Sequence, residues 1–129
     1  LLPLVNHLVV SEKFALHLSS THNARAACEK LIENRDAVVV TCGESGAWFC
    51  SRENQTPRHF PAFKVETVDS TGCGDVFHGA YAASLAWGWN LEKRVRFASA
   101  AAAIKATRFG AQAGAPRREE VEALINARG

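Results

Sequence analysis

Residues 68–80 read VDSTGCGDVFHGA, and this stretch decides the fold that we expect. Gly72 and Gly74 allow backbone conformations that other residues avoid, so successive N–H groups can point at one place. The apolar residues that follow predict a helix, and the N-terminus of a helix attracts an anion. We therefore expect residues 72–74 to form an anion-binding turn.

Asp75 follows this turn directly. A site that only binds phosphate gains nothing from a carboxylate in the first helical turn. A site that transfers the phosphoryl group to a hydroxyl needs a base beside the phosphate, and a carboxylate can be that base. The layout therefore predicts phosphoryl transfer. The alternative is an ordinary first-turn acid that stabilises the helix dipole by about 0.3–1 kcal/mol.

The composition predicts one soluble domain. The chain has 129 residues, of which 47% are hydrophobic and 22% charged, and its net charge is +2. Basic and acidic residues are interspersed, which argues against a nucleic-acid partner or a basic membrane-binding face. The cysteines lack Cys-x-x-Cys spacing, which argues against zinc and favours reduced thiols in the cytoplasm. No apolar run approaches the roughly 18 residues of a membrane span, and no signal peptide is recognisable.

Hydrophobic patterns predict strands and helices in the first half of the chain. Residues 8–10 and 37–41 read as buried strands, and glycines in 43–46 should turn the second into a paired strand at 47–50. Residues 58–63 read as an extended edge segment, because a proline there cannot donate to a ladder. Ser11 and Thr21 are the expected caps of two intervening helices, the second ending near Asn34.

Helices dominate the second half. They are predicted at about 75–86, at about 91–107 with Asn90 as the cap, and from a first turn containing Pro116 to about Ala127. The chain has no methionine and opens within an apolar pattern, so we interpret residues 1–129 as a single-domain part of a longer polypeptide.

Four segments together resemble one known family. Residues 69–80 resemble the second signature of the ribokinase-like carbohydrate kinases, also called the PfkB family. Residues 41–47, TCGESGA, resemble its Thr-x-Gly-x-x-Gly nucleotide loop, residues 96–102 are similar to its helix beside the adenine, and residues 110–112 agree as well. The resemblance spans essentially the whole chain. It implies the C-terminal part of a three-layer α/β/α fold with a mostly parallel sheet flanked by helices, without the lid and the N-terminal half.

The resemblance also implies roles at the turn. Asp75 would be the base that deprotonates a sugar hydroxyl, and the N–H groups of Gly72, Cys73 and Gly74 would form the anion hole. Phosphoryl transfer depends mainly on positioning and electrostatic stabilisation, which agrees with both roles. Some family members bind a monovalent cation such as K⁺ through carbonyl oxygens. The resemblance leaves such a site open near Asp69, Thr71 and the loop from Lys105 to Gly110.

The resemblance further places the nucleotide. Thr41, Gly43 and Gly46 would lie along ATP, with Ser99 near the adenine. Mg²⁺ would arrive with the nucleotide phosphates, and no direct ligand is assigned to it. Alternatively, Gly43 and Gly46 only form the turn of a hairpin, and Ser99 only permits close helix packing.

Two departures from the family pattern limit these expectations. Residues 11–14, SEKF, replace the family's Asn-x-x-Glu. Ketohexokinase-like members resemble this chain in that difference, so the resemblance favours a ketohexokinase-like subgroup. The family's sugar-binding residues lie mainly in the N-terminal half, so we expect this chain alone to be inactive and to need that half as a partner. A homodimer stays open.

The leading hypothesis is therefore an ATP-dependent sugar kinase. A nucleoside kinase or another small-alcohol kinase of the same fold is the close alternative. From another class, a non-catalytic nucleotide-binding or regulatory module remains. A dinucleotide-binding Rossmann turn is disfavoured, because the third glycine comes at Gly79 and Asp75 would face the pyrophosphate.

Overall fold

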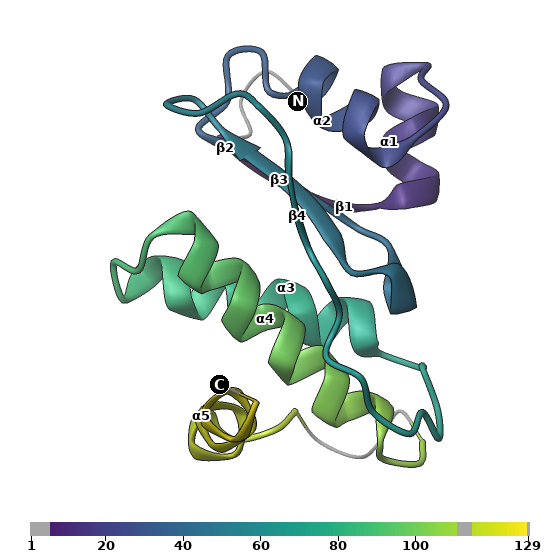
Figure 1. Cartoon of the computed structure of the whole chain (residues 1–129), viewed down its shortest axis with the longest axis vertical. Coiled ribbons are helices and arrows are strands. Elements are labelled where there is room, and N and C mark those ends of the chain that lie inside the picture. The colour runs from purple at the N-terminus through teal and green to yellow at the C-terminus, as the bar shows by residue number, and fades with distance from the viewer. Residues whose placement is uncertain (1–5, 111–114, 129) are drawn as a thin grey trace. The chain divides into compact units, whose positions relative to one another are not determined.

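The computed structural model describes residues 6–110 and 115–128, and the chain divides into two compact units, Leu1–Pro61 and Ala62–Gly129. In the described residues, the first unit contains a sheet with two helices, and the second contains three helices (Figure 1). The single domain expected from the sequence stays a prediction.

The first unit is built on a mixed sheet. Its strands are β1 (His7–Ser11), β2 (Ala37–Thr41), β3 (Ala47–Ser51) and β4 (Arg58–Phe60), in the order β1-β2-β3-β4. β1 and β2 pair in parallel, and the other two pairs are antiparallel. The strands predicted at 8–10, 37–41 and 47–50 are confirmed, and so is the hairpin of β2 with β3. The extended edge segment predicted at 58–63 is a strand only over Arg58–Phe60.

Two helices connect β1 to β2. They are α1 (Glu12–Ser19) and α2 (Ala24–Leu31). Ser11 caps α1 as predicted, its Oγ accepting the N–H of Phe14 at 3.4 Å.

The cap and the end predicted for α2 are wrong. Asn23 caps this helix in place of Thr21, and Asn23 Oδ1 accepts the N–H of Ala26 at 2.8 Å. The hydroxyl of Thr21 instead pairs with Ser19 Oγ at 2.6 Å. α2 stops at Leu31, short of Asn34, whose positive φ of 61° is incompatible with a continuing helix.

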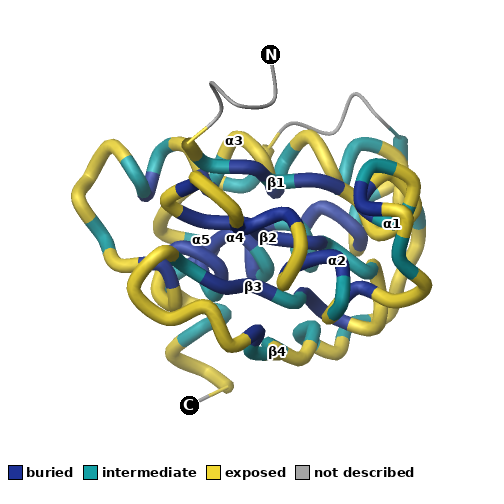
Figure 2. The backbone as a smooth tube through the Cα atoms, turned by 90° about the horizontal axis from the view of Figure 1, so that it is seen from above, coloured by how far each residue is buried: buried dark blue, intermediate teal, exposed yellow. Residues whose placement is uncertain are grey.

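An apolar core holds the helices of this unit against the sheet. Alternate residues of β1 and of β2 contribute to it, together with the buried faces of α1 and α2 (Figure 2). Its buried members are Leu8, Val10, Ala15, Ala24, Ala27, Cys28, Leu31, Ile32, Val38, Val40 and Cys50. The β-branched runs noted in the sequence therefore do become buried strands.

The second unit contains α3 (Cys73–Ala86), α4 (Leu91–Ala106) and α5 (Arg118–Ala127). Asn90 caps α4 as predicted, accepting the N–H of Lys93 at 2.9 Å. α3 begins at Cys73, earlier than predicted. Pro116 precedes α5 and is not in its first turn, because Arg117 is the N-cap residue.

Small and aromatic residues pack the second unit. Phe97, Ala100, Ala101 and Val121 are its buried cluster, joined by partly buried residues such as Val76 and Leu124. The alanines permit close packing of α4 against its neighbours. The rings of Trp87, Trp89 and Phe97 are also in mutual contact, with centroids 5.0 to 5.4 Å apart.

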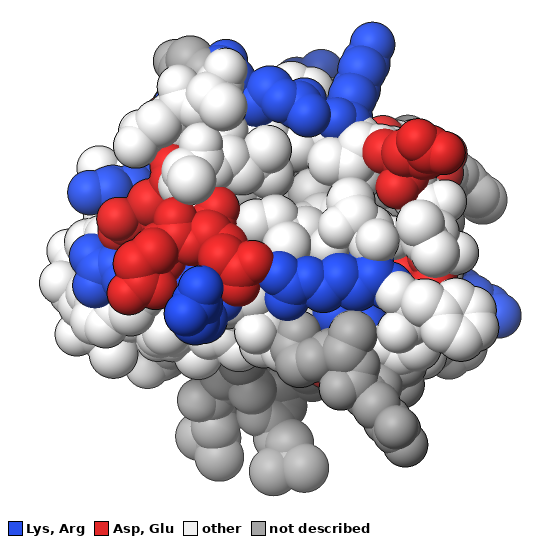
Figure 3. Space-filling model, turned by 90° about the horizontal axis from the view of Figure 1, so that it is seen from below, with Lys and Arg blue, Asp and Glu red and all other residues white. Residues whose placement is uncertain are grey.

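Charges of both signs lie together on the surface drawn in Figure 3. On α5, an ion pair joins Arg118 Nε to Glu122 Oε1 at 2.8 Å. Among the described residues, no helix is both long and apolar enough to cross a membrane.

Candidate active site

The turn after β2 holds three of the residues expected along a nucleotide. Thr41 ends β2 opposite Ser11 of β1, and its hydroxyl donates to the carbonyl oxygen of Val10 at 3.4 Å. Gly43 has φ 57°, and Gly46 has φ 91° with ψ −140°, a combination that only glycine adopts readily. No heavy atom lies within 4 Å of a Cβ built at Gly43, so its backbone conformation, and not crowding, favours glycine there.

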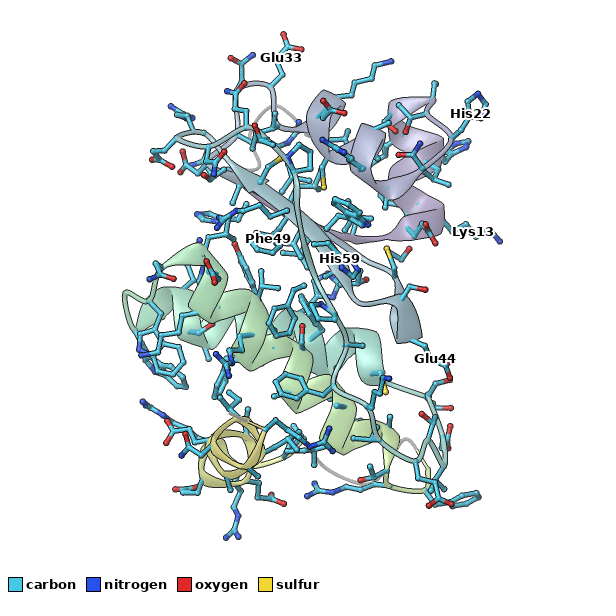
Figure 4. All side chains as sticks on the ribbon, in the orientation of Figure 1. Lys13, His22, Glu33, Glu44, Phe49 and His59 are labelled. Atoms are coloured by element: carbon cyan, nitrogen blue, oxygen red, sulfur yellow. The ribbon has the colours of Figure 1, made fainter. Side chains whose placement is uncertain are left out.

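Backbone hydrogen bonds close this turn. Cys42 N–H donates to Gly46 O at 2.8 Å, and Gly46 N–H donates to Gly43 O at 3.1 Å. On β4, His59 Nε2 lies 2.6 Å from Ser45 O, and Figure 4 shows His59 on its strand and Glu44 on the turn. No sequence pattern indicates this use of His59, because its partner is a backbone atom.

Burial raises the pKa of the Cys42 thiol to about 11, and the nearby Glu12 carboxylate adds to the effect. The thiol is therefore neutral at physiological pH. The start of α1 and the turn after β2 lie near each other, at the carboxyl ends of the two parallel strands, because Ser11 and Thr41 are partners in that pair.

In the second unit, Asp69 organises the segment before α3. Its Oδ1 accepts the N–H of Thr71, and its Oδ2 accepts the N–H of Gly110, each at 2.9 Å. The N–H groups of Val68 and Asp69 donate to Ala106 O at 2.8 and 3.1 Å. The segment before α3 is thus fixed to the C-terminal end of α4.

Gly72 then starts α3 as its N-cap residue, with φ 81° and no side-chain cap. Cys73 N–H donates to Ser70 O at 3.2 Å, whereas the structure gives the N–H groups of Gly72 and Gly74 no partner among the residues that it describes. At the positive end of a helix, two free N–H groups can receive an anion. Cys73 N–H would have to exchange its bond to do so.

The Cys73 side chain faces α4. Its Sγ contacts Ala102 O at 3.5 Å, and burial raises the pKa of the thiol. A neutral thiol adds no negative charge beside the free N–H groups. Cysteine is therefore compatible with an anion at this turn.

Asp75 lies exposed in the first turn of α3. It is one of the residues that line a cavity of about 480 Å³ between α3, α4 and the start of α5. The rest of the lining is mostly apolar, with Arg118 as its other charged residue. A carboxylate that solvent and a small molecule can reach fits the function of a base.

Two other side chains have simpler surroundings. His78 Nδ1 lies 2.9 Å from Gly74 O, so this ring bonds to its own helix. Ser99 is half-buried on α4, and Ala102, which contacts Cys73, lies one turn away on the same face. Ser99 and the turn after β2 belong to different units, so their joint action on a nucleotide stays a prediction.

Sequence reasoning missed the side chain of Lys105, because it considered only the carbonyl oxygens of the loop from Lys105 to Gly110, as neighbours of a cation. Its side chain is 2% exposed, and Nζ donates to Thr71 O at 3.1 Å and to Gly110 O at 2.9 Å. The sequence spacing could have revealed it, because Lys105 follows Ala101 by four residues and Ala98 by seven and so lies on the same helical face. Both alanines are buried on α4. A lysine on a buried helical face needs a polar partner.

Comparisons with known proteins agree on one family. The sequence profile of the pfkB family of carbohydrate kinases matches residues 1–118. Ribokinase of Bacillus subtilis (strain 168) is 41% identical over 89 residues, which are 69% of this chain and 30% of that protein. The chain therefore spans less than a third of that relative. The ketohexokinase-like subgroup stays a prediction.

Solved structures agree as well. A putative ribokinase II from E. coli, in complex with ATP and Mg²⁺, matches with a TM-score of 0.87 and 31% identity, over 98% of this chain and 41% of that one. Arabidopsis thaliana ribokinase, complexed with ribose and ATP, matches with a TM-score of 0.85 and 26% identity, over 96% and 42%. These matches confirm the predicted ribokinase-like fold class for the part that the chain spans. The chain belongs to the pfkB family of carbohydrate kinases.

Proposed function

We propose that the protein containing this chain transfers the γ-phosphoryl group of ATP to a hydroxyl group of a sugar. The observation that supports this most strongly is the start of α3. There the exposed carboxylate of Asp75 follows the N–H groups of Gly72 and Gly74, which have no partner among the described residues. A base and anion-binding donors are thus adjacent on one rigid element.

In the proposed step, Asp75 accepts the proton of the sugar hydroxyl as its oxygen forms a bond to the γ-phosphorus. The bond from that phosphorus to the oxygen of ADP breaks. The N–H groups of Gly72, Cys73 and Gly74 donate to the phosphoryl oxygens, where negative charge is spread during transfer. These donors keep their positions because Asp69 and Lys105 fix the preceding turn.

The proposal includes the nucleotide contacts that the family resemblance implies. Thr41, Gly43 and Gly46 would lie along ATP, and Ser99 would lie near the adenine. The E. coli relative was solved with ATP and Mg²⁺, which supports both here. Mg²⁺, when bound with the nucleotide, neutralises phosphate charge.

We further propose that the sugar is selected by residues outside this chain. The chain matches 30% of the B. subtilis ribokinase, and the predicted site contains a base and nucleotide contacts but no assigned sugar contact. A kinase activity therefore belongs to the longer polypeptide, with the N-terminal half as the partner of residues 1–129. A homodimer stays a prediction.

The test is ATP consumption by the complete polypeptide across ketoses, pentoses, nucleosides and small alcohols. Phosphorylation of a pentose or ketose supports the proposal, and preference for a nucleoside transfers it to the alternative substrate class. ATP binding without turnover on any of these acceptors would contradict it and favour a non-catalytic module.

A further inference from the structure

Lys105 carries a buried positive charge directly behind the turn that starts α3. Its side chain is 2% exposed, and its Nζ donates to Thr71 O at 3.1 Å and Gly110 O at 2.9 Å. A Cβ at Gly72 would lie 3.6 Å from Lys105 Cε and 3.9 Å from Nζ. The ammonium group is therefore next to the residue that opens the proposed anion site.

Within the described residues, the hydrogen-bond partners of this ammonium group are oxygen atoms. Two are the carbonyl oxygens of Thr71 and Gly110, and the Asp69 carboxylate is close enough for the charge of Lys105 to influence it. Hydrogen bonds from Thr71 and then Gly110 lower the pKa of Asp69 to about 2, with a smaller contribution from Lys105. Carbonyl and carboxylate oxygens are also the ligands that K⁺ prefers.

A monovalent cation near Asp69 and Thr71 does not fit this arrangement, because Lys105 Nζ already bonds to the Thr71 carbonyl oxygen. We infer that the ammonium group of Lys105 replaces a bound monovalent cation in this protein. A covalently attached charge then holds the turn before α3 in place, whatever the K⁺ concentration. The consequence for catalysis rests on the proposed kinase function, but the consequence for stability does not.

A purely mechanical clamp is the other explanation of Lys105, and two variants separate the explanations. Lys105→Ala removes the ammonium and leaves space between the oxygen atoms. Lys105→Met removes the charge but keeps a side chain of similar length, so that space stays filled. A cation site predicts that K⁺ or NH₄⁺ stabilises the alanine variant and not the methionine variant.

The experiment measures the melting temperature of the complete polypeptide in equal concentrations of potassium, ammonium, lithium and choline chloride. The unmodified protein should melt at the same temperature in potassium and choline. Lys105→Ala should melt several degrees lower in choline and recover in potassium or ammonium, because an ion that binds only the folded state stabilises it. Lys105→Met should stay low in all four salts.

Three results would overturn the inference. The first is a melting temperature of the unmodified protein that rises specifically in K⁺. The second is a Lys105→Ala variant, folded or unfolded, whose stability K⁺ does not restore. The third is a Lys105→Met variant that K⁺ stabilises as much as it stabilises Lys105→Ala. ATP turnover of the unmodified protein in potassium and choline is a second readout, and it should be equal. If no acceptor is phosphorylated, the proposed function fails, while the melting series still decides the inference.

Discussion

The carboxylate of Asp69 accepts the backbone N–H of Gly110 at 2.9 Å, although the two residues are 41 positions apart in the sequence. The same carboxylate accepts the N–H of Thr71. One side chain thus joins the segment before α3 to the segment after α4. The position of Asp75, at the start of α3, depends on this connection.

The Asp69 carboxylate should make the stability of the folded protein fall at low pH. Its pKa in the folded protein is lowered to about 2, chiefly by hydrogen bonds from Thr71. An unfolded aspartate has a pKa of about 3.9. The charged carboxylate therefore stabilises the folded state fully at pH values above the pKa of the unfolded aspartate. This stabilisation is lost as the pH falls through the folded pKa of about 2.

Melting temperatures between roughly pH 5 and pH 2 test this, since the transition lies in that window. The unmodified protein should lose stability on acidification more steeply than Asp69→Asn. Glu53→Gln, which changes an exposed carboxylate, serves as the control and should keep the original slope. Parallel curves for Asp69→Asn and the unmodified protein would show that this carboxylate does not stabilise the fold.

Gly72→Ala and Gly74→Ala should have opposite effects on stability. Gly72 has φ 81°, where a Cβ costs about 1–2 kcal/mol, and the nearest side-chain atom, at 3.6 Å, adds only ordinary contact. Gly74 lies in the first turn of α3 with nothing within 4 Å of its Cβ position. Alanine there should favour the helix by about 0.5–1 kcal/mol.

Urea unfolding of both glycine variants checks the difference. The free energy of unfolding should be highest for Gly74→Ala, intermediate for the unmodified protein and lowest for Gly72→Ala. The reverse order for the two variants would mean that the turn does not have the backbone conformation described.

Asn23→Ala should lower the free energy of unfolding by about 1 kcal/mol, because it removes the side-chain cap of α2. Asn23→Asp keeps an acceptor for the N–H of Ala26 and should cost much less. Urea unfolding of the two variants tests this. Equal losses would show that the side-chain oxygen is not what stabilises this end of the helix.

The strands and most helices could be predicted from the sequence because their signals are local. The run 37–40 is apolar and mostly β-branched, and Asn90 directly precedes a helical pattern. The cap of α2 was mispredicted because Thr21 and Asn23 are both good caps. A hydrogen bond between Thr21 and Ser19 separates them, and neither residue type predicts that pairing.

The candidate site could be predicted in part for the same reason. Glycines and Asp75 form a continuous motif, whereas Lys105 binds backbone carbonyl oxygens 34 residues before it and five after it. Backbone oxygens are common to all residues, so sequence alone does not reveal them as partners. His59 bonds to Ser45 O in the same way.

The function of Asp75 as the base is the central claim. Asp75→Asn keeps the size of the side chain and removes its ability to accept a proton, while Asp75→Glu keeps the carboxylate and moves it. Because Asp75 is exposed, neither change should unfold the protein.

The decisive measurement compares ATP affinity and sugar-dependent turnover of the complete polypeptide with those of Asp75→Asn. We predict unchanged ATP affinity and a loss of turnover of at least about 10²-fold. Equal turnover in the two proteins would contradict the assignment of Asp75 as the base.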